Sequence, residues 1–134
     1  MLDTNVLVSG LLSPFGPHGE IVRMVSSGAL ALCVDARILA EYEEVLARPR
    51  FGFDPHAVAA LVDFISVNSE IAVSRPLAQR LPDPDDEPCL EVTLACGADC
   101  LVTGNVVHFP SGSRAGVAVL TPAELVEELR TRDA

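Results

Sequence analysis

Short apolar runs and amphipathic stretches alternate along the whole chain. Residues 19–27 place Ile21, Val22 and Val25 on one face of a helix, because these positions recur with the helical period. Leu30–Val34 is short and apolar throughout, which is typical of a strand buried on both faces of a sheet. The chain opens with Met1–Leu2, which we interpret as the stub of a first strand.

Helix start and stop signals divide the rest of the chain. Asp35 is a fitting N-cap, and Pro49 ends the helix that follows it. Asp54-Pro55 begins another helix as its N-cap and first helical residue. Thr121–Glu124 reads as a capping box that opens a last helix. The apolar stripes expected on the first two of these helices are Ile38, Leu39, Tyr42, Val45 and Leu46, and Val58, Leu61, Val62 and Ile65. The remaining expected elements are a buried helix over Cys89–Cys96 that ends at Gly97, and strands at Ile71–Val73, Leu101–Val102 and Val117–Leu120.

The order of these elements predicts the fold class. Strands and helices alternate, which favours right-handed crossovers and a parallel sheet covered by helices on both faces. We therefore expect an α/β fold, a three-layer α/β/α sandwich around a central parallel sheet of about five short strands. No repeat or linker interrupts the pattern, so residues 1–134 are expected to form a single domain.

Polar side chains follow several of the predicted strands. Asp3 and Asn5 come after the first strand, and Thr103 and Asn105 come after Leu101–Val102. Asp83, Asp85 and Asp86 precede the buried helix. Ligands bind beyond the carboxyl ends of the strands in an open parallel sheet, so these groups are expected at one edge. Carboxylate and amide oxygens without Cys or His suit Mg²⁺ or Mn²⁺.

The helix after Leu30–Val34 offers a further carboxylate. Its apolar stripe centres near Tyr42, and at 100° per residue Glu44 lies roughly opposite that centre. Glu41 and Glu43 flank the stripe at similar angles, so geometry alone does not choose between them.

Composition and charge narrow the function classes. Apolar residues make up 49% of the chain, enough for a buried core. The net charge is −10 and all nine basic residues are Arg, which argues against a passive nucleic-acid binder more than against a metal-dependent nuclease. No apolar run approaches the roughly 20 residues of a membrane span. With no signal peptide in the sequence either, we expect a cytoplasmic protein with no membrane partner.

The four cysteines, Cys33, Cys89, Cys96 and Cys100, sit within apolar runs. They have no C-x-x-C spacing and do not cluster with the histidines, so they are expected to be buried reduced thiols rather than zinc ligands.

Four motifs occur in order along the chain, and together they resemble the PIN-domain family. They are Leu2–Ser9 (LDTNVLVS), Ile38–Leu46 (ILAEYEEVL), Asp85–Gly97 (DDEPCLEVTLACG) and Leu101–Phe109 (LVTGNVVHF). The resemblance places the family's acidic residues on Asp3, Glu41 and Asp86. It places Asn105 where many relatives carry a fourth carboxylate.

The resemblance implies a metal-assisted ribonuclease. Asp3, Glu41 and Asp86 would hold one or two Mg²⁺ or Mn²⁺ ions, Asn105 would complete the catalytic set, and Asn5 and Thr103 would orient ligands or waters. Many compact bacterial relatives are toxins of toxin–antitoxin pairs, which implies an RNA substrate, a cognate antitoxin and a homodimer.

Several of these residues can instead have a purely structural role. Asp3 can instead be a helix N-cap, Glu41 a solvated helix edge, and Asn105 a turn residue. Asp83 and Asp85 are better explained as caps, and His108 as structural. The arginines Arg48, Arg50 and Arg114 are candidates for RNA phosphate contacts or plain surface charge.

Three other classes of protein are alternatives to a PIN-domain nuclease. A phosphatase of the haloacid-dehalogenase type would need an acid at position 5, where this chain has Asn5, and a Lys, which the chain lacks. The missing Lys also argues against a receiver domain. A PIN-like regulatory module without metal affinity stays open. Only Met1 and Leu2 precede Asp3, so we also hypothesise a start site upstream or a truncated central strand.

Overall fold

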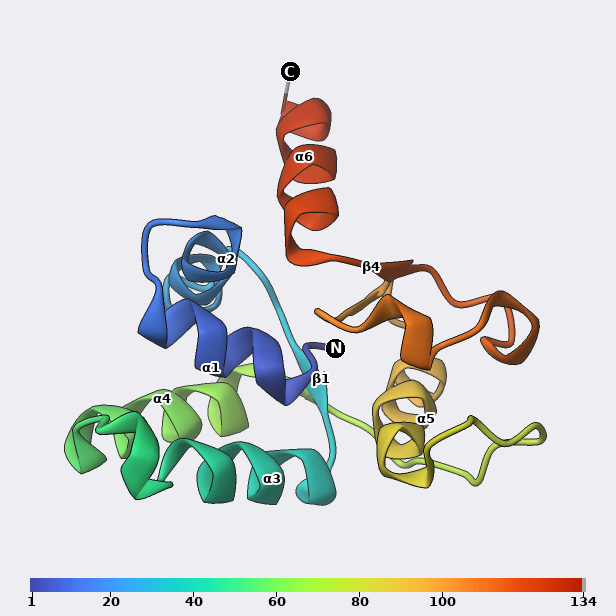
Figure 1. Ribbon diagram of the computed structural model, residues 1–134, viewed down its shortest axis with the longest axis horizontal. Coiled ribbons are helices and arrows are strands. Elements are labelled where there is room, and N and C mark those ends of the chain that lie inside the picture. Colours follow the sequence, from blue (N-terminus) through green and yellow to red (C-terminus); the bar gives the residue numbers. More distant parts are fainter. Residues whose placement is uncertain (134) are drawn as a thin grey trace.

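The computed structural model describes residues 1–133 and consists mainly of helices joined by short strands (Figure 1). The α-helices are α1 (Thr4–Leu12), α2 (Pro17–Ser26), α3 (Ala36–Leu46), α4 (Pro55–Asn68), α5 (Glu87–Cys96) and α6 (Pro122–Asp133). The strands are β1 (Cys33–Val34), β2 (Glu70–Ile71), β3 (Leu101–Val102) and β4 (Val119–Leu120). Short 3₁₀ helices are η1 (Pro49–Phe51), η2 (Pro84–Asp86), η3 (Val106–His108) and η4 (Ser111–Ser113).

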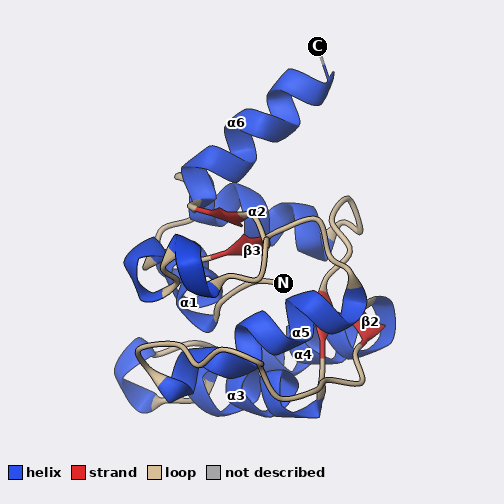
Figure 2. Ribbon diagram, turned by 90° about the vertical axis from the view of Figure 1, so that its right-hand side faces the viewer, coloured by secondary structure: helices blue, strands red, loops and turns tan. Residues whose placement is uncertain are grey.

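The strands form two separate parallel pairs, visible as short arrows among the helices in Figure 2. β1 pairs with β2, and β3 pairs with β4. Leu2 adds a single parallel bridge to Val102, so the expected strand stub at the start of the chain lies beside β3. The elements are α/β with parallel strands, as predicted. The expected central sheet of about five strands is not formed among residues 1–133.

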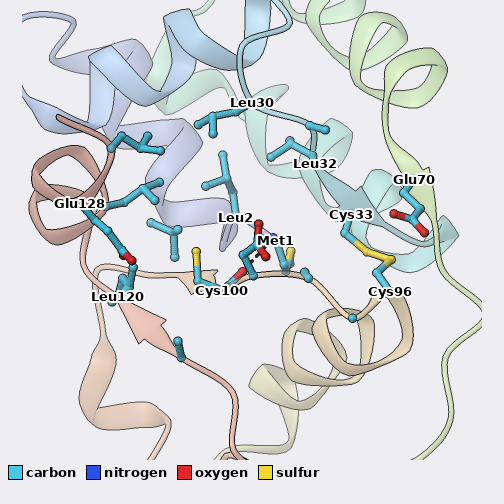
Figure 3. A pocket seen from close by; sticks show the side chains of 18 of the residues that line it. Met1, Leu2, Leu30, Leu32, Cys33, Glu70, Cys96, Cys100, Leu120 and Glu128 are labelled. Atoms are coloured by element: carbon cyan, nitrogen blue, oxygen red, sulfur yellow. Dashed lines mark hydrogen bonds between the residues drawn. A yellow bond between two sulfur atoms is a disulfide. The ribbon is translucent and has the colours of Figure 1, made fainter. Parts of the chain in front are cut away.

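A groove lies between the two strand pairs. It has a volume of about 360 Å³ and lies at the amino ends of the strands, between the segment that leads into β1 and the segment that leads into β3 (Figure 3). Leu30 and Leu32 line one side of it and Cys100 the other, with Met1 and Leu2 also at its wall. A ladder needs hydrogen-bonding partners on both strands, and the Met1–Leu2 stub supplies only one bridged residue. The apolar runs Leu30–Val34 and Val117–Leu120 contain two strand residues each.

The helix boundaries follow the local signals in the sequence closely. The Asp35 side chain accepts a hydrogen bond from the Ile38 backbone N–H at 3.0 Å and caps α3. Asp54 caps α4 through the His56 N–H. Gly97 ends α5 in the left-handed conformation, with φ of 61°, where a residue without Cβ is favoured. These predictions are confirmed because each depends on residues within one turn of the chain.

The capping box at the start of α6 is also confirmed. The Thr121 backbone N–H donates to Glu124 Oε1 at 2.9 Å, and the Glu124 N–H donates to Thr121 Oγ1 at 3.2 Å. α6 stands at one end of the molecule in Figure 1 and packs against α2, with Arg130 and Glu20 forming an ion pair at 3.2 Å. None of the helices in the described part of the chain combines the length and apolar character needed to cross a membrane.

The main hydrophobic core joins the strands to the helices around them. Its largest fully buried side chains include Tyr42 from α3 and Phe109 from the segment after η3. The Tyr42 hydroxyl donates to the Leu2 carbonyl, which ties α3 to the residue that precedes Asp3.

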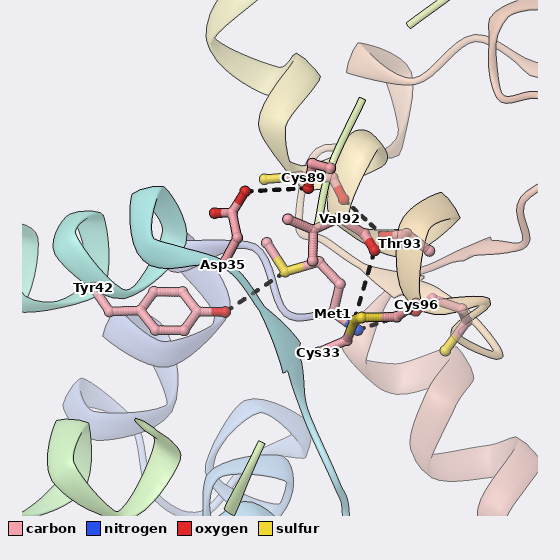
Figure 4. Close-up of a disulfide and its surroundings, with 10 residues drawn as sticks. Met1, Cys33, Asp35, Tyr42, Cys89, Val92, Thr93 and Cys96 are labelled. Atoms are coloured by element: carbon pink, nitrogen blue, oxygen red, sulfur yellow. Dashed lines mark hydrogen bonds between the residues drawn. A yellow bond between two sulfur atoms is a disulfide. The ribbon is translucent and has the colours of Figure 1, made fainter. Parts of the chain in front are cut away.

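The expectation of four reduced thiols is wrong for two of the cysteines. Cys33 on β1 and Cys96 at the end of α5 form a disulfide across 63 positions of sequence (Figure 4). Cys89 and Cys100 are free thiols. Spacing along the chain did not reveal the pair, because β1 and α5 come together only through tertiary packing, with their Cα atoms 6.4 Å apart at this bond.

Candidate functional site

Asp3 and Thr103 lie side by side because Leu2 and Val102 are paired. The Asp3 backbone N–H donates to the Val102 carbonyl at 2.9 Å, and Thr103 follows directly on the same strand. The buried Thr103 hydroxyl then donates to Asp3 Oδ2 at 2.8 Å. Asp3 does occupy the N-cap position of α1, yet its side chain makes no capping hydrogen bond. Its carboxylate is therefore directed to the loop after β3 rather than to its own helix.

Asn5 connects Asp3 to the same loop. Its Nδ2 group donates to Asp3 Oδ2 at 3.3 Å, while its Oδ1 accepts from the Gly104 N–H at 3.3 Å. Both residues expected to orient Asp3, Asn5 and Thr103, thus contact its carboxylate in the structure.

The structure distinguishes the three glutamates of α3. The Thr4 hydroxyl at the start of α1 donates to Glu41 Oε2, so Glu41 faces the segment that carries Asp3. Glu44 forms an exposed ion pair with Arg48 at 2.9 Å, and Glu43 lines a groove between α3 and α4. Glu41 is therefore the glutamate nearest the predicted site, although its side chain is largely exposed.

Asp86 lies where η2 meets α5 and is only partly exposed. Its Oδ2 atom is fully buried and accepts no hydrogen bond from the described residues, although His108 Nδ1 lies 3.2 Å away. Burial raises the pKa of Asp86, and the negative charges of Asp83 and Asp3 raise it further, while His108 opposes the shift.

The neighbouring acids of this loop have other partners. Asp83 accepts a hydrogen bond from the Asp85 N–H at 2.9 Å, as expected of a cap. Glu87 accepts from Arg80 and from the Leu81 N–H, both at 3.0 Å. Asp86 differs from these two acids because one of its carboxylate oxygens is buried and accepts no hydrogen bond from the described residues.

The negative charges of Asp3, Glu41 and Asp86 all act on one buried group, the Cys89 thiol. Burial raises the pKa of Cys89 well above its ordinary value, and all three negative charges raise it further. Asp3 and Glu41 accept hydrogen bonds from neighbouring side chains, however, and among residues 1–133 no three Asp, Glu, His or Cys side chains come close enough to share one ion. The residues converge on one region without forming a closed ligand set.

Asn105 does not join this group by any side-chain hydrogen bond in residues 1–133. Its side chain is exposed, and only its backbone N–H contributes, donating to Thr103 Oγ1 at 3.0 Å. It lies beside the site as part of the loop.

The three candidate RNA-binding arginines have different surroundings. Arg114 Nε donates to the Phe109 carbonyl at 2.6 Å, which gives it a structural contact. The Arg50 guanidinium lies over the Phe51 ring, 4.7 Å from its centroid. Arg48 is paired with Glu44, and Glu44, then Glu41, raise its pKa. Arg48 is thus the arginine of the three with an electrostatic link to a site carboxylate.

Sequence reasoning missed two contacts at the site. No signal in the sequence distinguished Thr4, which lies between Asp3 and Asn5. Its hydrogen bond to Glu41 depends on how α1 packs against α3. His108 stood within the last motif, but no local pattern linked it to Asp86 across 22 positions of sequence.

Comparison with known proteins identifies the family. A family profile described as PIN domain matches residues 1–107 of this chain. The chain belongs to the PIN domain family. PIN domains are generally nucleases and generally bind divalent metals. The matched range includes Asp3, Glu41 and Asp86, and it ends just before His108. No curated protein and no solved structure matched the chain.

The residues present in this PIN domain fit a hard divalent cation in their chemistry. Asp3, Glu41 and Asp86 supply only carboxylate oxygens, which Mg²⁺ and Mn²⁺ prefer. The raised pKa of Asp86, caused by burial and by nearby negative charge, is what carboxylates show when they are crowded without a cation.

Proposed function

We propose that this PIN domain is a divalent-metal-dependent endoribonuclease that hydrolyses phosphodiester bonds in RNA. One observation carries the proposal. Asp3, Glu41 and Asp86 come from three separate parts of the chain and are linked by short contacts: Thr4, next to Asp3, donates to Glu41, and the loop after β3 contacts Asp3 through Thr103 and lies beside Asp86 through His108. None of the three forms an ion pair with an arginine in the described part of the chain. Carboxylates placed together without a cationic partner are suited to hold a metal ion.

The site residues would have separate roles in binding the metal ion. Asp3 and Asp86 would bind Mg²⁺ or Mn²⁺ and Glu41 would complete the set. Thr103 and Asn5 keep the Asp3 carboxylate oriented, and their hydrogen bonds to Oδ2 leave Oδ1 to face a ligand. A bound cation supplies a Lewis acid for the scissile phosphate and lowers the pKa of water.

Asn105 would contribute less than the three carboxylates. An amide at this position removes one negative charge relative to a carboxylate, which weakens affinity for a second cation. Its side chain is exposed and forms no hydrogen bond with Asp3 in the described structure, which supports a peripheral part in the reaction. We therefore propose one strong cation site rather than two equal ones.

Substrate binding would depend on few positive charges. Arg48 is exposed and interacts electrostatically with Glu41, so it is the arginine best placed to contact an RNA phosphate next to the site. The Arg50 guanidinium lies over the Phe51 ring on η1, and Arg114 donates to the Phe109 carbonyl.

The wider assignment rests on the family resemblance. We propose that the protein acts in the cytoplasm as the toxin of a toxin–antitoxin pair, that it forms a homodimer, and that a small antitoxin silences it. The strongly acidic chain, with a net charge of −10, favours a basic partner segment. Sedimentation analysis of the pure protein tests the dimer separately from catalysis.

The first experiment is cleavage of labelled single-stranded RNAs with Mg²⁺, Mn²⁺ or EDTA. We expect cleavage that requires the cation and falls at least about 100-fold in Asp3→Asn and Asp86→Asn, because loss of a ligand charge weakens both binding and chemistry. Asp83→Asn is the matched control for Asp86→Asn, since Asp83 lies on the same loop and only caps a backbone N–H. Equal activity of Asp86→Asn and Asp83→Asn would exclude the assigned site.

Glu41→Gln and Glu43→Gln form a second matched pair on α3. We expect only the first to lose activity, because Glu41 is held at the site by Thr4 and Glu43 faces α4.

A second candidate function is a PIN-like regulatory module that acts through protein contacts. It is favoured by the lack of three side chains close enough to share one ion in residues 1–133. Calorimetry with Mn²⁺ separates the two functions, since the nuclease binds the cation and the regulatory module does not.

A further inference from the structure

The loop between β3 and η4 touches two of the three site carboxylates. At its start, the Thr103 hydroxyl donates to Asp3 Oδ2 at 2.8 Å and accepts from the Asn105 N–H at 3.0 Å. At its other end, His108 Nδ1 lies 3.2 Å from Asp86 Oδ2. One short segment of chain therefore spans the site from the Asp3 side to the Asp86 side.

The backbone at His108 is well anchored. Its N–H donates to the Asn105 carbonyl at 3.0 Å within η3, and the next residue, Phe109, is fully buried in the core. Arg114 Nε donates to the Phe109 carbonyl and fixes the segment from the other side. The imidazole itself is about half exposed, with a side-chain exposure of 46%. His108 thus has a fixed backbone and a half-exposed ring whose Nδ1 lies 3.2 Å from Asp86 Oδ2.

The buried Oδ2 atom of Asp86 lacks a hydrogen-bond donor among the described residues. A buried carboxylate oxygen without a donor is costly, and ligating carboxylates in metal sites are usually held by a hydrogen bond from a second residue. Among residues 1–133, His108 is the one cationic or imidazole side chain within ion-pair distance of this oxygen.

We propose that His108 is a positioning residue for Asp86. Its Nδ1–H donates to the buried Oδ2, which holds the carboxylate in place and leaves Oδ1 for the cation. The role requires the Nδ1–H tautomer of the neutral ring, since the tautomer is set by the hydrogen bond that the imidazole makes. This inference rests on the proposed metal-dependent function, and it adds a residue outside the range that matches the family profile.

The test uses three substitutions at His108 and measures Mn²⁺ affinity without RNA. His108→Asn keeps an amide N–H near the Nδ1 position, His108→Gln places its amide near the Nε2 position, and His108→Ala removes the donor. We expect the Ala and Gln variants to bind Mn²⁺ about 10- to 100-fold more weakly, as for other residues that support a ligand, and the Asn variant to stay within about 3-fold of wild type. Since the His108 side chain is about half exposed, all three variants should fold, which circular dichroism checks.

A double substitution links the effect to Asp86. In an Asp86→Asn background, His108→Ala should change Mn²⁺ affinity little, because the carboxylate that His108 holds is gone. If His108→Ala weakens binding equally in both backgrounds, the residue acts through another group and the proposal is wrong. Rescue by Gln but not by Asn would also overturn it, since the ring would then act through Nε2.

An NMR measurement on the metal-free protein tests the contact between His108 and Asp86 independently of metal binding. Nitrogen NMR of the His108 ring at pH 8 should show the Nδ1–H tautomer in wild type and the Nε2–H tautomer in Asp86→Ala. The same Nε2–H tautomer in both proteins would remove the contact on which the inference depends. Wild-type protein that binds no Mn²⁺ would overturn the proposed function itself, whereas wild type and His108→Ala binding Mn²⁺ equally would overturn this inference alone.

Discussion

The Tyr42 hydroxyl offers a sharp test of how α3 supports the site. Tyr42 is fully buried and donates to the carbonyl of Leu2, the residue before Asp3. The other ladder bonds of this segment use the Met1 carbonyl and the Asp3 N–H, both with Val102. The Leu2 carbonyl therefore points away from β3, and Tyr42 is its partner among the described residues. Burial raises the pKa of Tyr42 well above its ordinary value, so the phenol remains a donor at neutral pH.

Tyr42→Phe removes one oxygen and leaves the aromatic packing in place. The Leu2 carbonyl is then buried without a hydrogen-bond donor, and such a group costs about 1–3 kcal/mol. A domain of this size has a free energy of unfolding of about 5–15 kcal/mol, so the loss is a measurable fraction of the whole. With a urea m-value of about 2 kcal/mol/M, we expect the midpoint to fall by roughly 0.5–1.5 M.

Urea unfolding followed by circular dichroism is the suitable assay, because the chain has no Trp and Tyr42 is its single Tyr. Thr93→Val is the matched control. Thr93 is also buried, and its hydroxyl donates to the Cys89 carbonyl at 2.7 Å inside α5. That carbonyl keeps its helical hydrogen bond in the variant, so we expect a change of about 0.5 kcal/mol or less. If Tyr42→Phe changes stability no more than Thr93→Val does, the hydroxyl does not hold the Leu2 carbonyl and the reasoning fails.

Three further predictions concern the disulfide, a cap and the site. Reducing Cys33–Cys96, which joins positions 63 residues apart, should lower the free energy of unfolding by about 2–4 kcal/mol in urea titrations with and without reductant; equal midpoints would contradict the bond. Burial alone would raise the pKa of Asp35, but hydrogen bonds led by Arg37 lower it overall, so its ionised form stabilises the fold above about pH 4 and this stability is lost as pH falls through the lowered pKa. Asp35→Asn should therefore cost about 1 kcal/mol at pH 7 and progressively less as the pH falls below about 4, and a difference independent of pH would refute the assignment. Thr103→Val should weaken Mn²⁺ binding about 10-fold, whereas Thr103→Ser should preserve it, and calorimetry that finds both equal to wild type would show that the hydroxyl does not matter.

The parts of the fold that the sequence predicted well are those with local causes. Asp35 and Asp54 cap the helices that follow them, and Gly97 ends α5, because each acts on backbone groups within one turn. The strands were predicted less well, since an apolar run such as Leu30–Val34 becomes a strand only where another backbone lies beside it. In this chain only Cys33–Val34 of the run pairs with another strand, and residues 30–33 line the groove.

At the candidate site too, the sequence predicted the features with local causes and missed those that depend on tertiary packing. Helical geometry left Glu41 and Glu43 equivalent, because it reports only the angle of a side chain around α3. The contact with Thr4 separates them, and that contact exists because α1 packs against α3. The disulfide and the position of His108 beside Asp86 were equally out of reach, since both join elements far apart in the sequence.

One arrangement connects these long-range contacts to function. Asp3 is placed by the pairing of Leu2 with Val102, and Asp86 lies at the start of α5, whose other end is joined to β1 through Cys96. The loop after β3 contacts Asp3 through Thr103 and reaches Asp86 through His108. The distance between these two carboxylates therefore depends on how the β3 loop and α5 are held relative to each other. A cation that binds both would stabilise that relation, so Mn²⁺ should raise the unfolding temperature of wild type more than that of Thr103→Val or His108→Ala.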